Sequence, residues 1–152
     1  PWVLERYYRS DESALDADGW FDTGDISTID ELGFMRITDR KKDVIKSGGE
    51  WISSIDLENI AAGCPGVRIA AVVGIFHPKW EERPIMLIEC HAGSEVSDEI
   101  VRSYLEQHVP KWWMPDRIFF EDVPMTATGK IDKKSIRVRH KDALWKKEDV
   151  SQ

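Results

Sequence analysis

The segment DRKKDVIKSGGEW, residues 39–51, decides how this chain divides and folds. Five consecutive charged residues, 39–43, lead through a β-branched pair to Gly48-Gly49, and the helix-start signal Ser53-Ser54 follows. Glycines at such a turn allow positive φ and leave no side chain between backbone and ligand. Backbone of this kind can come close to an anionic, phosphate-bearing ligand. The same features suit backbone that must move, so a domain boundary is expected at residues 39–43.

Residues after 43 alternate between helical and strand patterns, which is typical of a small α+β domain. The expected order is β-α-β-β-α-β-α, with a three-stranded sheet flanked by helices. After the first strand we expect a helix from Ser53 or Ser54 to Gly63, strands over 67–75 and 85–92, a helix from Ser97 to Pro110, a strand over 117–120 and a helix over 132–141. The first helix should present Ile55, Ile60 and Ala61 on one face, and residues 79–83 should form a charged loop.

The chain before residue 39 resembles a set of β-hairpins without a hydrophobic core of their own. The expected elements are a strand over 2–8, an acidic loop over 11–19, and a hairpin of residues 20–29 and 34–38 that turns at residues 30–33. The chain should therefore divide into a hairpin part at 1–41, a second domain at 42–140 and a tail at 141–152.

The composition is that of a globular protein, with 41% hydrophobic and 32% charged residues among 152. The chain begins with Pro1 rather than Met, so we expect it to be processed or cut from something longer. Its net charge of -7 lies in residues 1–31, which hold nine acidic residues against two arginines. Basic segments at 36–46 and 130–147 on an acidic protein argue against nucleic-acid binding and fit a small anionic ligand.

Neither a metal site nor a membrane span is expected. Cys64 and Cys90 form no CxxC pair and fit reduced thiols, and the four histidines show no HxH or HxxxH spacing. No apolar run approaches the roughly 20 residues that a transmembrane helix needs. There is no secretory signal pattern either, so a cytoplasmic location is expected.

One lysine follows a glycine in PMTATGKI, residues 124–131. The flexible stem of Lys130 could carry its charge into a neighbouring site, where phosphate and carboxylate oxygens are natural partners. The alternative is an exposed lysine at a helix start. The segment is not the P-loop GxxxxGK[ST], because the first glycine is missing and Ile131 follows the lysine.

Other polar and aromatic side chains lie beside turns. Asp25 could accept two ribose hydroxyls, or it could form an Asx turn. Arg40 could bind a phosphate or ribose through its forked guanidinium. Trp51 could stack on a base or lie in the core, which is the default for tryptophan. The last helix should keep its basic side chains in solvent, namely Lys133, Lys134, Arg137 and Arg139.

Three motifs in this order resemble the adenylate-forming enzymes: TGD at 23–25, DRxKDxIKSGGEWIS at 39–53 and TxTGK at 126–130. This family includes the acyl-CoA synthetases, firefly-type luciferases and peptide-synthetase adenylation domains. Three segments are most similar to the medium- and long-chain fatty acyl-CoA synthetases, namely GGEWISSIDLE, HPKWEERP (residues 77–84) and KWWMPD (residues 111–116). The resemblance extends from about Pro1 to Arg139 but covers only the C-terminal quarter or so of such an enzyme.

The resemblance implies a reaction in two steps. A fatty acid carboxylate attacks the α-phosphate of ATP to give acyl-AMP and pyrophosphate, and the thiol of CoA then gives the thioester and AMP. It implies that Asp25 holds the ribose hydroxyls, that Arg40 contacts ribose or phosphate, and that Lys42 is the hinge within the nucleotide site. Lys130 would bridge the carboxylate and the α-phosphate, where it stabilises charge that develops during adenylation.

The resemblance also gives roles to the segment from Lys46 to Trp51. Lys46 and Trp51 would approach the nucleotide when the domain closes, and Gly48, Gly49 and Glu50 would line the pantetheine tunnel for CoA. Residues 1–41 would be the last hairpins of a large N-terminal domain, which is the expected partner. That missing domain would hold the phosphate loop, the acyl tunnel and the Mg²⁺-binding acid, so this chain alone should be inactive.

Two other readings stay open. The chain could belong to an adenylate-forming enzyme that activates an aryl or amino acid, or it could be a non-catalytic nucleotide-binding module. The GGEWIS wording favours an acyl-CoA ligase, although the acid is selected in the missing domain. The presence of Asp25, Arg40, Lys42 and Lys130 argues against decay of the site.

Overall fold

The computed structural model describes residues 4–145 and divides into two compact units, which meet in sequence between Lys42 and Asp43. In the first unit, β1 (Asp25–Ile29) and β2 (Met35–Arg40) form a two-stranded antiparallel sheet. Asp30 closes the turn between them, because its Oδ1 accepts hydrogen bonds from the backbone amides of Leu32 and Phe34. The expected hairpin is therefore present.

The strand expected over 2–8 is wrong where the structure describes it, since residues 4–8 form bends and a turn. Residues 2 and 3 lie outside the described part. The hydrogen bonds here are irregular, from Ser10 N to Tyr7 O and from Ala14 N to Glu5 O. Within residues 4–42 no strand pairs with residues 4–8, so their apolar and aromatic side chains are not sufficient to make a strand.

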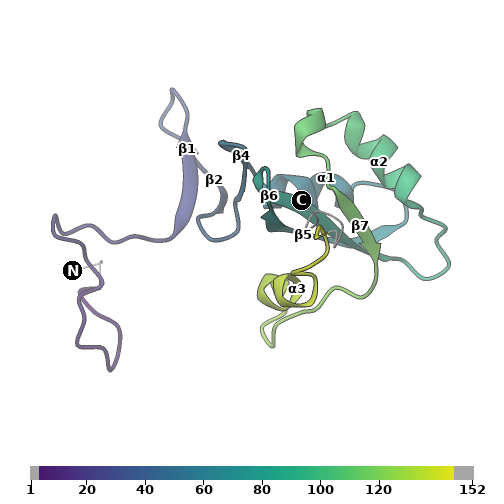
Figure 1. The fold of residues 1–152 in the computed structure, drawn as a ribbon. Coiled ribbons are helices and arrows are strands. Elements are labelled where there is room, and N and C mark those ends of the chain that lie inside the picture. The colour runs from purple at the N-terminus through teal and green to yellow at the C-terminus, as the bar shows by residue number, and fades with distance from the viewer. Residues whose placement is uncertain (1–3, 146–152) are drawn as a thin grey trace, which may run out of the picture. The chain divides into compact units, whose positions relative to one another are not determined.

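In the second unit, residues 43–145 contain a five-stranded mixed sheet, shown in Figure 1. Its strands are β3 (Ile45–Ser47), β4 (Glu50–Ile52), β5 (Val67–His77), β6 (Glu81–Cys90) and β7 (Arg117–Phe120). The long β5–β6 hairpin is antiparallel, and β7 runs parallel to β6. The α+β class is confirmed. The sheet of residues 43–145 has five strands rather than three, and the β3–β4 hairpin stands where the expected order has a single strand before the first helix. It joins β6 where Ser47 lies opposite Glu81.

The described residues of this unit, 43–145, also form three α-helices and one 3-10 helix: α1 (Ser54–Ala62), α2 (Asp98–Glu106), η1 (Lys111–Trp113) and α3 (Lys133–Arg139). The expected N-terminal caps of α1 and α2 are confirmed, since Ser53 and Ser97 accept hydrogen bonds from Asp56 N and Ile100 N. Within α1 the buried residues are Ser54, Leu57 and Ala61. Ile55 and Ile60 are only half-buried, so the expected face was displaced around the helix.

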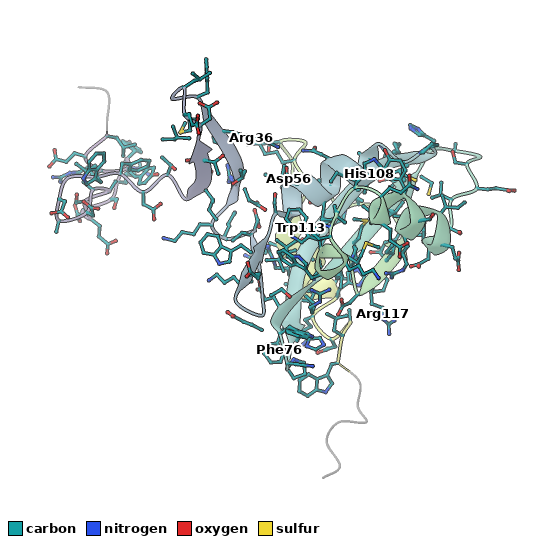
Figure 2. All side chains as sticks on the ribbon, turned by 90° about the horizontal axis from the view of Figure 1, so that it is seen from above. Arg36, Asp56, Phe76, His108, Trp113 and Arg117 are labelled. Atoms are coloured by element: carbon teal, nitrogen blue, oxygen red, sulfur yellow. The ribbon has the colours of Figure 1, made fainter. Side chains whose placement is uncertain are left out.

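The sheet carries a core on each face. One core packs β5 and β6 against α1 and α2, with Leu57, Val72 and Leu105 fully buried and Trp113 partly buried against them (Figure 2). The other packs the alternate residues of the same strands, including Val73 and Leu87, against Ile136 of α3. Figure 1 shows α3 on the opposite side of the sheet from α1 and α2. The near-continuous apolar run of β5 is explained by burial on both faces.

Candidate functional site

Asp25 and Arg40 lie opposite each other across the β1–β2 ladder, with 3.8 Å between Asp25 Oδ1 and Arg40 Nε. The carboxylate and the guanidinium predicted for a nucleotide are thus brought together. Asp22, rather than Asp25, accepts the Asx-type hydrogen bond, which comes from Gly24 N at 2.8 Å. This backbone hydrogen bond and then the Lys41 ammonium hold the pKa of Asp22 below its ordinary value.

A shallow pocket of about 420 Å³ adjoins this pair. Its lining combines the Thr-Gly turn with three cationic residues, namely Thr23, Gly24, Arg40, Lys41 and Lys42. Cations beside exposed turn backbone form a surface that suits phosphate oxygens. Lys42 is exposed and is the last residue of the first unit, so the division of the chain falls at the residue predicted to be the hinge.

The β3–β4 hairpin carries Lys46 and Trp51 as a cross-strand pair. Alternation along the two strands buries Ile45, Ser47 and Ile52 and turns Lys46 and Trp51 toward solvent. Trp51 is 56% exposed, so the core alternative for this tryptophan is wrong. An exposed indole beside an exposed lysine can stack on a planar ring and contact an anion.

Gly48 and Gly49 form the two-residue turn of this hairpin, with φ of +61° and +89°. Two successive positive φ values are typical of the tight hairpin turn that favours glycine. Gly48 N donates a hydrogen bond to Trp80 O at 2.9 Å, and a Cβ at residue 48 would lie 2.8 Å from Trp80 Cε3. Gly48 is therefore required both for its φ and for the approach of Trp80, whereas Gly49 has open space around it.

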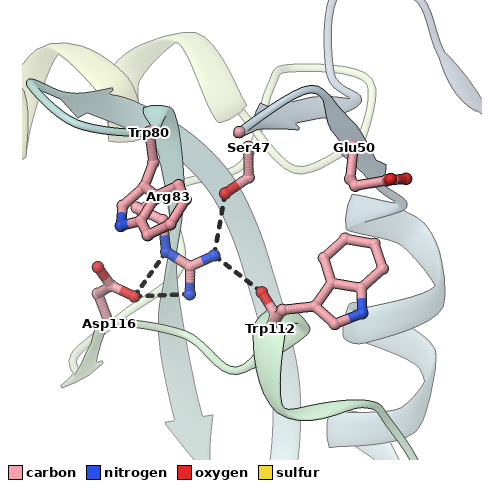
Figure 3. A pocket seen from close by; sticks show the side chains of 7 residues that line it. Ser47, Glu50, Trp80, Arg83, Trp112 and Asp116 are labelled. Carbon is pink, nitrogen blue, oxygen red and sulfur yellow. Dashed lines mark hydrogen bonds and ion pairs between the residues drawn. The ribbon is translucent and has the colours of Figure 1, made fainter.

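The turn forms one wall of a pocket of about 550 Å³, which Figure 3 shows from close by. The pocket brings together three segments that are distant in sequence, and its lining residues are Ser47, Gly48, Glu50, Trp80, Arg83, Trp112 and Asp116. Trp80 and Trp112 lie on either side of the Arg83 guanidinium. Its volume lies within the range usual for small-molecule sites, about 300–1,000 Å³.

Sequence reasoning assigned no role to four of these residues: Trp80, Arg83, Trp112 and Asp116. Their signal was present, since HPKWEERP and KWWMPD carried part of the family resemblance. Their roles were missed because residues 79–83 were expected to form a solvated, charged loop. Residues 81–83 belong to β6 instead, and the Arg83 side chain is only 12% exposed. A charged run indicates a solvated loop only where no buried partner exists for the charge.

Lys130 ends a tight turn that is closed by its own backbone and hydroxyl groups. Thr126 N donates to Lys130 O at 2.7 Å, and Thr126 Oγ1 accepts from Lys130 N at 3.1 Å. Gly129 supplies the positive φ of +76° that the turn needs. Lys130 is exposed, and no hydrogen bond or ion pair of its ammonium is found within residues 4–145. It does not line the Trp80–Trp112 pocket.

The helix after this turn departs from the solvated face that was expected. Lys133 Nζ lies 2.7 Å from Ser54 Oγ and 2.9 Å from Glu58 Oε1, with its side chain 12% exposed. Arg137 Nη2 lies 2.8 Å from Asp43 Oδ1. Carboxylates beneath α3 thus draw two of its cations inward, while Lys134 and Arg139 are exposed as predicted. Of the tail expected at 141–152, residues 146–152 lie outside the described part.

No group of three or more His, Cys, Asp or Glu side chains that could hold a metal ion occurs in the described residues. Across the same residues, no helix combines the length and the apolar character needed to cross a membrane.

Comparison with known protein families identifies a match for the second unit. Residues 56–130 match the family described as AMP-binding enzyme C-terminal domain. The second unit carries an AMP-binding enzyme C-terminal domain. The resemblance to adenylate-forming acyl-CoA synthetases is thereby confirmed. The match spans α1, the β5–β6 hairpin, α2, β7 and the turn that ends at Lys130.

Relatives share more than this domain. The chain is 46% identical over 144 residues to the 3-methylmercaptopropionyl-CoA ligase of Ruegeria lacuscaerulensis, which is 94% of this chain and 27% of that protein. It is also 46% identical over 144 residues to the medium-chain-fatty-acid–CoA ligase of Ectopseudomonas oleovorans, covering 94% of this chain and 26% of that protein. The chain thus spans about a quarter of the length of these curated relatives.

Solved structures share the fold. ATP-bound MatB from Rhodopseudomonas palustris superposes with a TM-score of 0.79 at 30% identity, covering 86% of this chain and 26% of that one. The described residues therefore share their fold with part of a protein that was solved with ATP bound.

Proposed function

We propose that this chain is the C-terminal part of an ATP-dependent fatty acyl-CoA ligase. In the first step a carboxylate oxygen bonds to the α-phosphorus of ATP, and the bond from that phosphorus to pyrophosphate breaks. In the second step the sulfur of CoA bonds to the acyl carbon, AMP leaves and the thiol proton is released. A large N-terminal domain, absent from these residues, would bind the acid and the Mg²⁺ that accompanies ATP.

The observation that carries the proposal is the pocket beside the Gly48–Gly49 turn. It offers two tryptophan faces for a purine ring and a narrow backbone wall for a thin chain. Lys79 Nζ lies 4.7 Å from the centre of the Trp80 ring and adds positive charge near this wall. CoA combines an adenine, phosphates and a slender pantetheine arm. We therefore assign CoA to this pocket, with Glu50 at the tunnel mouth.

The other candidate residues receive roles in nucleotide chemistry. Asp25 would accept the ribose hydroxyls of ATP, and Arg40 would contact ribose or phosphate beside it. Lys46 and Trp51 would meet the nucleotide when the second unit closes over it. Lys130 would contact the carboxylate and the α-phosphate only in that closed arrangement, so that its charge acts where negative charge develops.

Lys42 would be the hinge between the two steps. The break between compact units falls directly after it, as a hinge requires. Rotation there would exchange Lys130 for the Gly48–Gly49 turn at the active site. A cytoplasmic location belongs to the same proposal.

A second candidate function differs in the acid that is activated. The 3-methylmercaptopropionyl-CoA ligase and the medium-chain-fatty-acid–CoA ligase are equally similar to this chain. A short thioether acid is therefore the first alternative substrate, and an aryl or amino acid is the next. The non-catalytic nucleotide-binding module stays as the last alternative.

The test is an assay of the full-length protein for each half-reaction, with acids of increasing chain length. We expect ATP–pyrophosphate exchange that depends on a fatty acid, and acyl-CoA formation after CoA is added. Exchange that depends only on 3-methylmercaptopropionate would select the alternative acid. A reading frame that starts directly before Pro1 would favour the binding module. Exchange by the isolated 152-residue chain would contradict its predicted inactivity.

A further inference from the structure

Arg83 connects the separate walls of the Trp80–Trp112 pocket. Its Nη1 donates to Ser47 Oγ at 3.0 Å, at the base of the Gly-Gly turn. The same nitrogen donates to Trp112 O at 2.8 Å, and Nη2 donates to Met114 O at 2.9 Å. Nε lies 2.9 Å and Nη2 2.8 Å from Asp116 Oδ1. Figure 3 shows the guanidinium at the centre of its contacts with Ser47, Trp112 and Asp116.

These contacts occupy the whole guanidinium. An arginine has five N–H donors in a fixed planar fork. One donor on Nε, two on Nη1 and two on Nη2 match the five contacts just given. The side chain is 12% exposed, so its charge is largely removed from solvent. Arg83 therefore has no N–H left with which to bind a ligand in the pocket.

Each of the two segments that Arg83 joins also has its own backbone hydrogen bond to the β6 region, from Gly48 N to Trp80 O and from Asp116 N to Pro84 O. The hydrogen bonds of Arg83 reach both segments. β3 pairs with β6 only at Ser47, and η1 begins after a proline and spans three residues. Trp112 O and Met114 O lie where the 3-10 turn opens into β7, so their acceptors need partners from outside the helix. The rigid fork of Arg83 thus sets the separation between the Gly-Gly turn and the Trp112 backbone.

We propose that Arg83 is a positioning residue for the thioester-forming step, because it holds the Gly48–Gly49 turn and the Trp112 segment at the spacing that CoA needs. This inference rests on the proposed function. Arg83 would act through its neighbours without touching CoA or the acyl-adenylate. Its loss should therefore affect the use of CoA and leave adenylation intact.

The primary test compares Arg83→Gln with wild type in the full-length enzyme, using both half-reactions. We expect the KM for CoA to rise about ten- to hundredfold, as a displacement near 1 Å would cause, with ATP–pyrophosphate exchange unchanged. Arg83→Lys keeps the charge but lacks the fork, so it should show a similar rise. An unchanged KM, an equal loss in both half-reactions, or full rescue by lysine would overturn the proposal.

Arg102 provides a matched control. Its Nη1 donates to Pro115 O at 2.8 Å, so it supports the same segment from α2 without contacting the Gly-Gly turn. Arg102→Gln should leave the KM for CoA near the wild-type value. Ser47→Ala serves if Arg83→Gln unfolds, because it removes only the bond between Arg83 and the turn. It should raise the KM for CoA less than Arg83→Gln does, and no rise would count against the proposal.

Amide hydrogen exchange on the 152-residue chain gives a readout that needs no activity. In Arg83→Gln, the amides of residues 47–50 and those of residues 112–114 and 116 should exchange faster together. In Arg102→Gln only the second set should do so. If only one of the two sets exchanged faster in Arg83→Gln, the proposal that Arg83 joins the two segments would be wrong. A wild-type enzyme that performs neither half-reaction would instead contradict the proposed function, and the exchange result would still decide the role of Arg83 between the two segments.

Discussion

The turn at residues 126–130 and the turn at residues 47–50 present their functional groups in different ways. The first is closed by hydrogen bonds within itself and leaves the Lys130 side chain exposed. The second is fixed from outside, by Trp80 O and by the Arg83 guanidinium. A lysine that must enter a site formed by another domain needs an exposed, flexible side chain, whereas a turn that forms the wall of a pocket needs a fixed position. The difference predicts that substitutions in the two turns will impair different half-reactions.

The largest expected effect is that of Lys130→Ala on adenylation in the full-length enzyme. The loss of one charge that contacts the transition state should slow ATP–pyrophosphate exchange about 10²–10³-fold. Thioester formation from supplied acyl-AMP should be largely preserved, because Lys130 does not line the Trp80–Trp112 pocket. Lys141→Ala, an exposed lysine after α3, is the control. Equal losses in both half-reactions would remove the distinction between the two turns.

The hinge should show the opposite selectivity. Lys42→Pro locks φ at this residue and restricts Lys41 before it. Adenylation should be spared, while the thioester step should slow by about tenfold to a hundredfold, because the Gly-Gly turn no longer reaches its position. Lys42→Ala keeps the backbone free and should behave like the wild type in the second step. If both half-reactions survive Lys42→Pro unchanged, the hinge lies elsewhere.

Lys133, which follows the turn at 126–130, tests whether the buried contacts of α3 with α1 stabilise the second unit. Lys133→Met removes the contacts to Ser54 and Glu58 and leaves a carboxylate that is only 13% exposed without this cation. The free energy of unfolding of the chain should fall by about 2 kcal/mol, measured by denaturant titration. Lys134→Met, on the exposed side of α3, should change it by no more than about 0.5 kcal/mol. Equal stability of the two variants would show that the buried contact contributes nothing.

The local features of the second unit could be predicted from sequence because short-range chemistry determines them. Ser53 and Ser97 cap their helices, and the apolar run from Val67 begins a strand covered on both faces. The strand over 117–120 was predicted with the bounds that the structure gives it. These signals depend on neighbouring residues, so no long-range contact was needed to interpret them.

The Trp80–Trp112 pocket could not be predicted because its walls are joined only by tertiary contacts. Arg83 is one charge in a charged run, and its partners lie 29 to 36 residues away in sequence. The burial of Lys133 fails to show in sequence for the same reason, since Ser54 is 79 residues away. The order of the motifs gave the family, and the structure supplied the contacts between them.

The smallest predicted effect, that of Gly48→Ala, is also the sharpest test of the turn at 47–50. Alanine there must adopt a positive φ and must displace the Trp80 ring, which would lie 2.8 Å from the new Cβ. The KM for CoA should rise about tenfold, equivalent to about 1.4 kcal/mol, with adenylation retained. Gly49→Ala is the matched control, because it has a similar φ of +89° and no atom within 4 Å of its Cβ.

The two glycine variants separate backbone strain from the contact with Trp80. Each should carry the cost of a left-handed alanine, about 1 kcal/mol or more. Only Gly48→Ala also moves an indole that lines the pocket, so its KM for CoA should exceed that of Gly49→Ala. Adding Trp80→Leu to Gly48→Ala should then produce no further rise, because the displaced ring is already lost to CoA. Additive effects of the two substitutions would show that Gly48 acts through its φ alone.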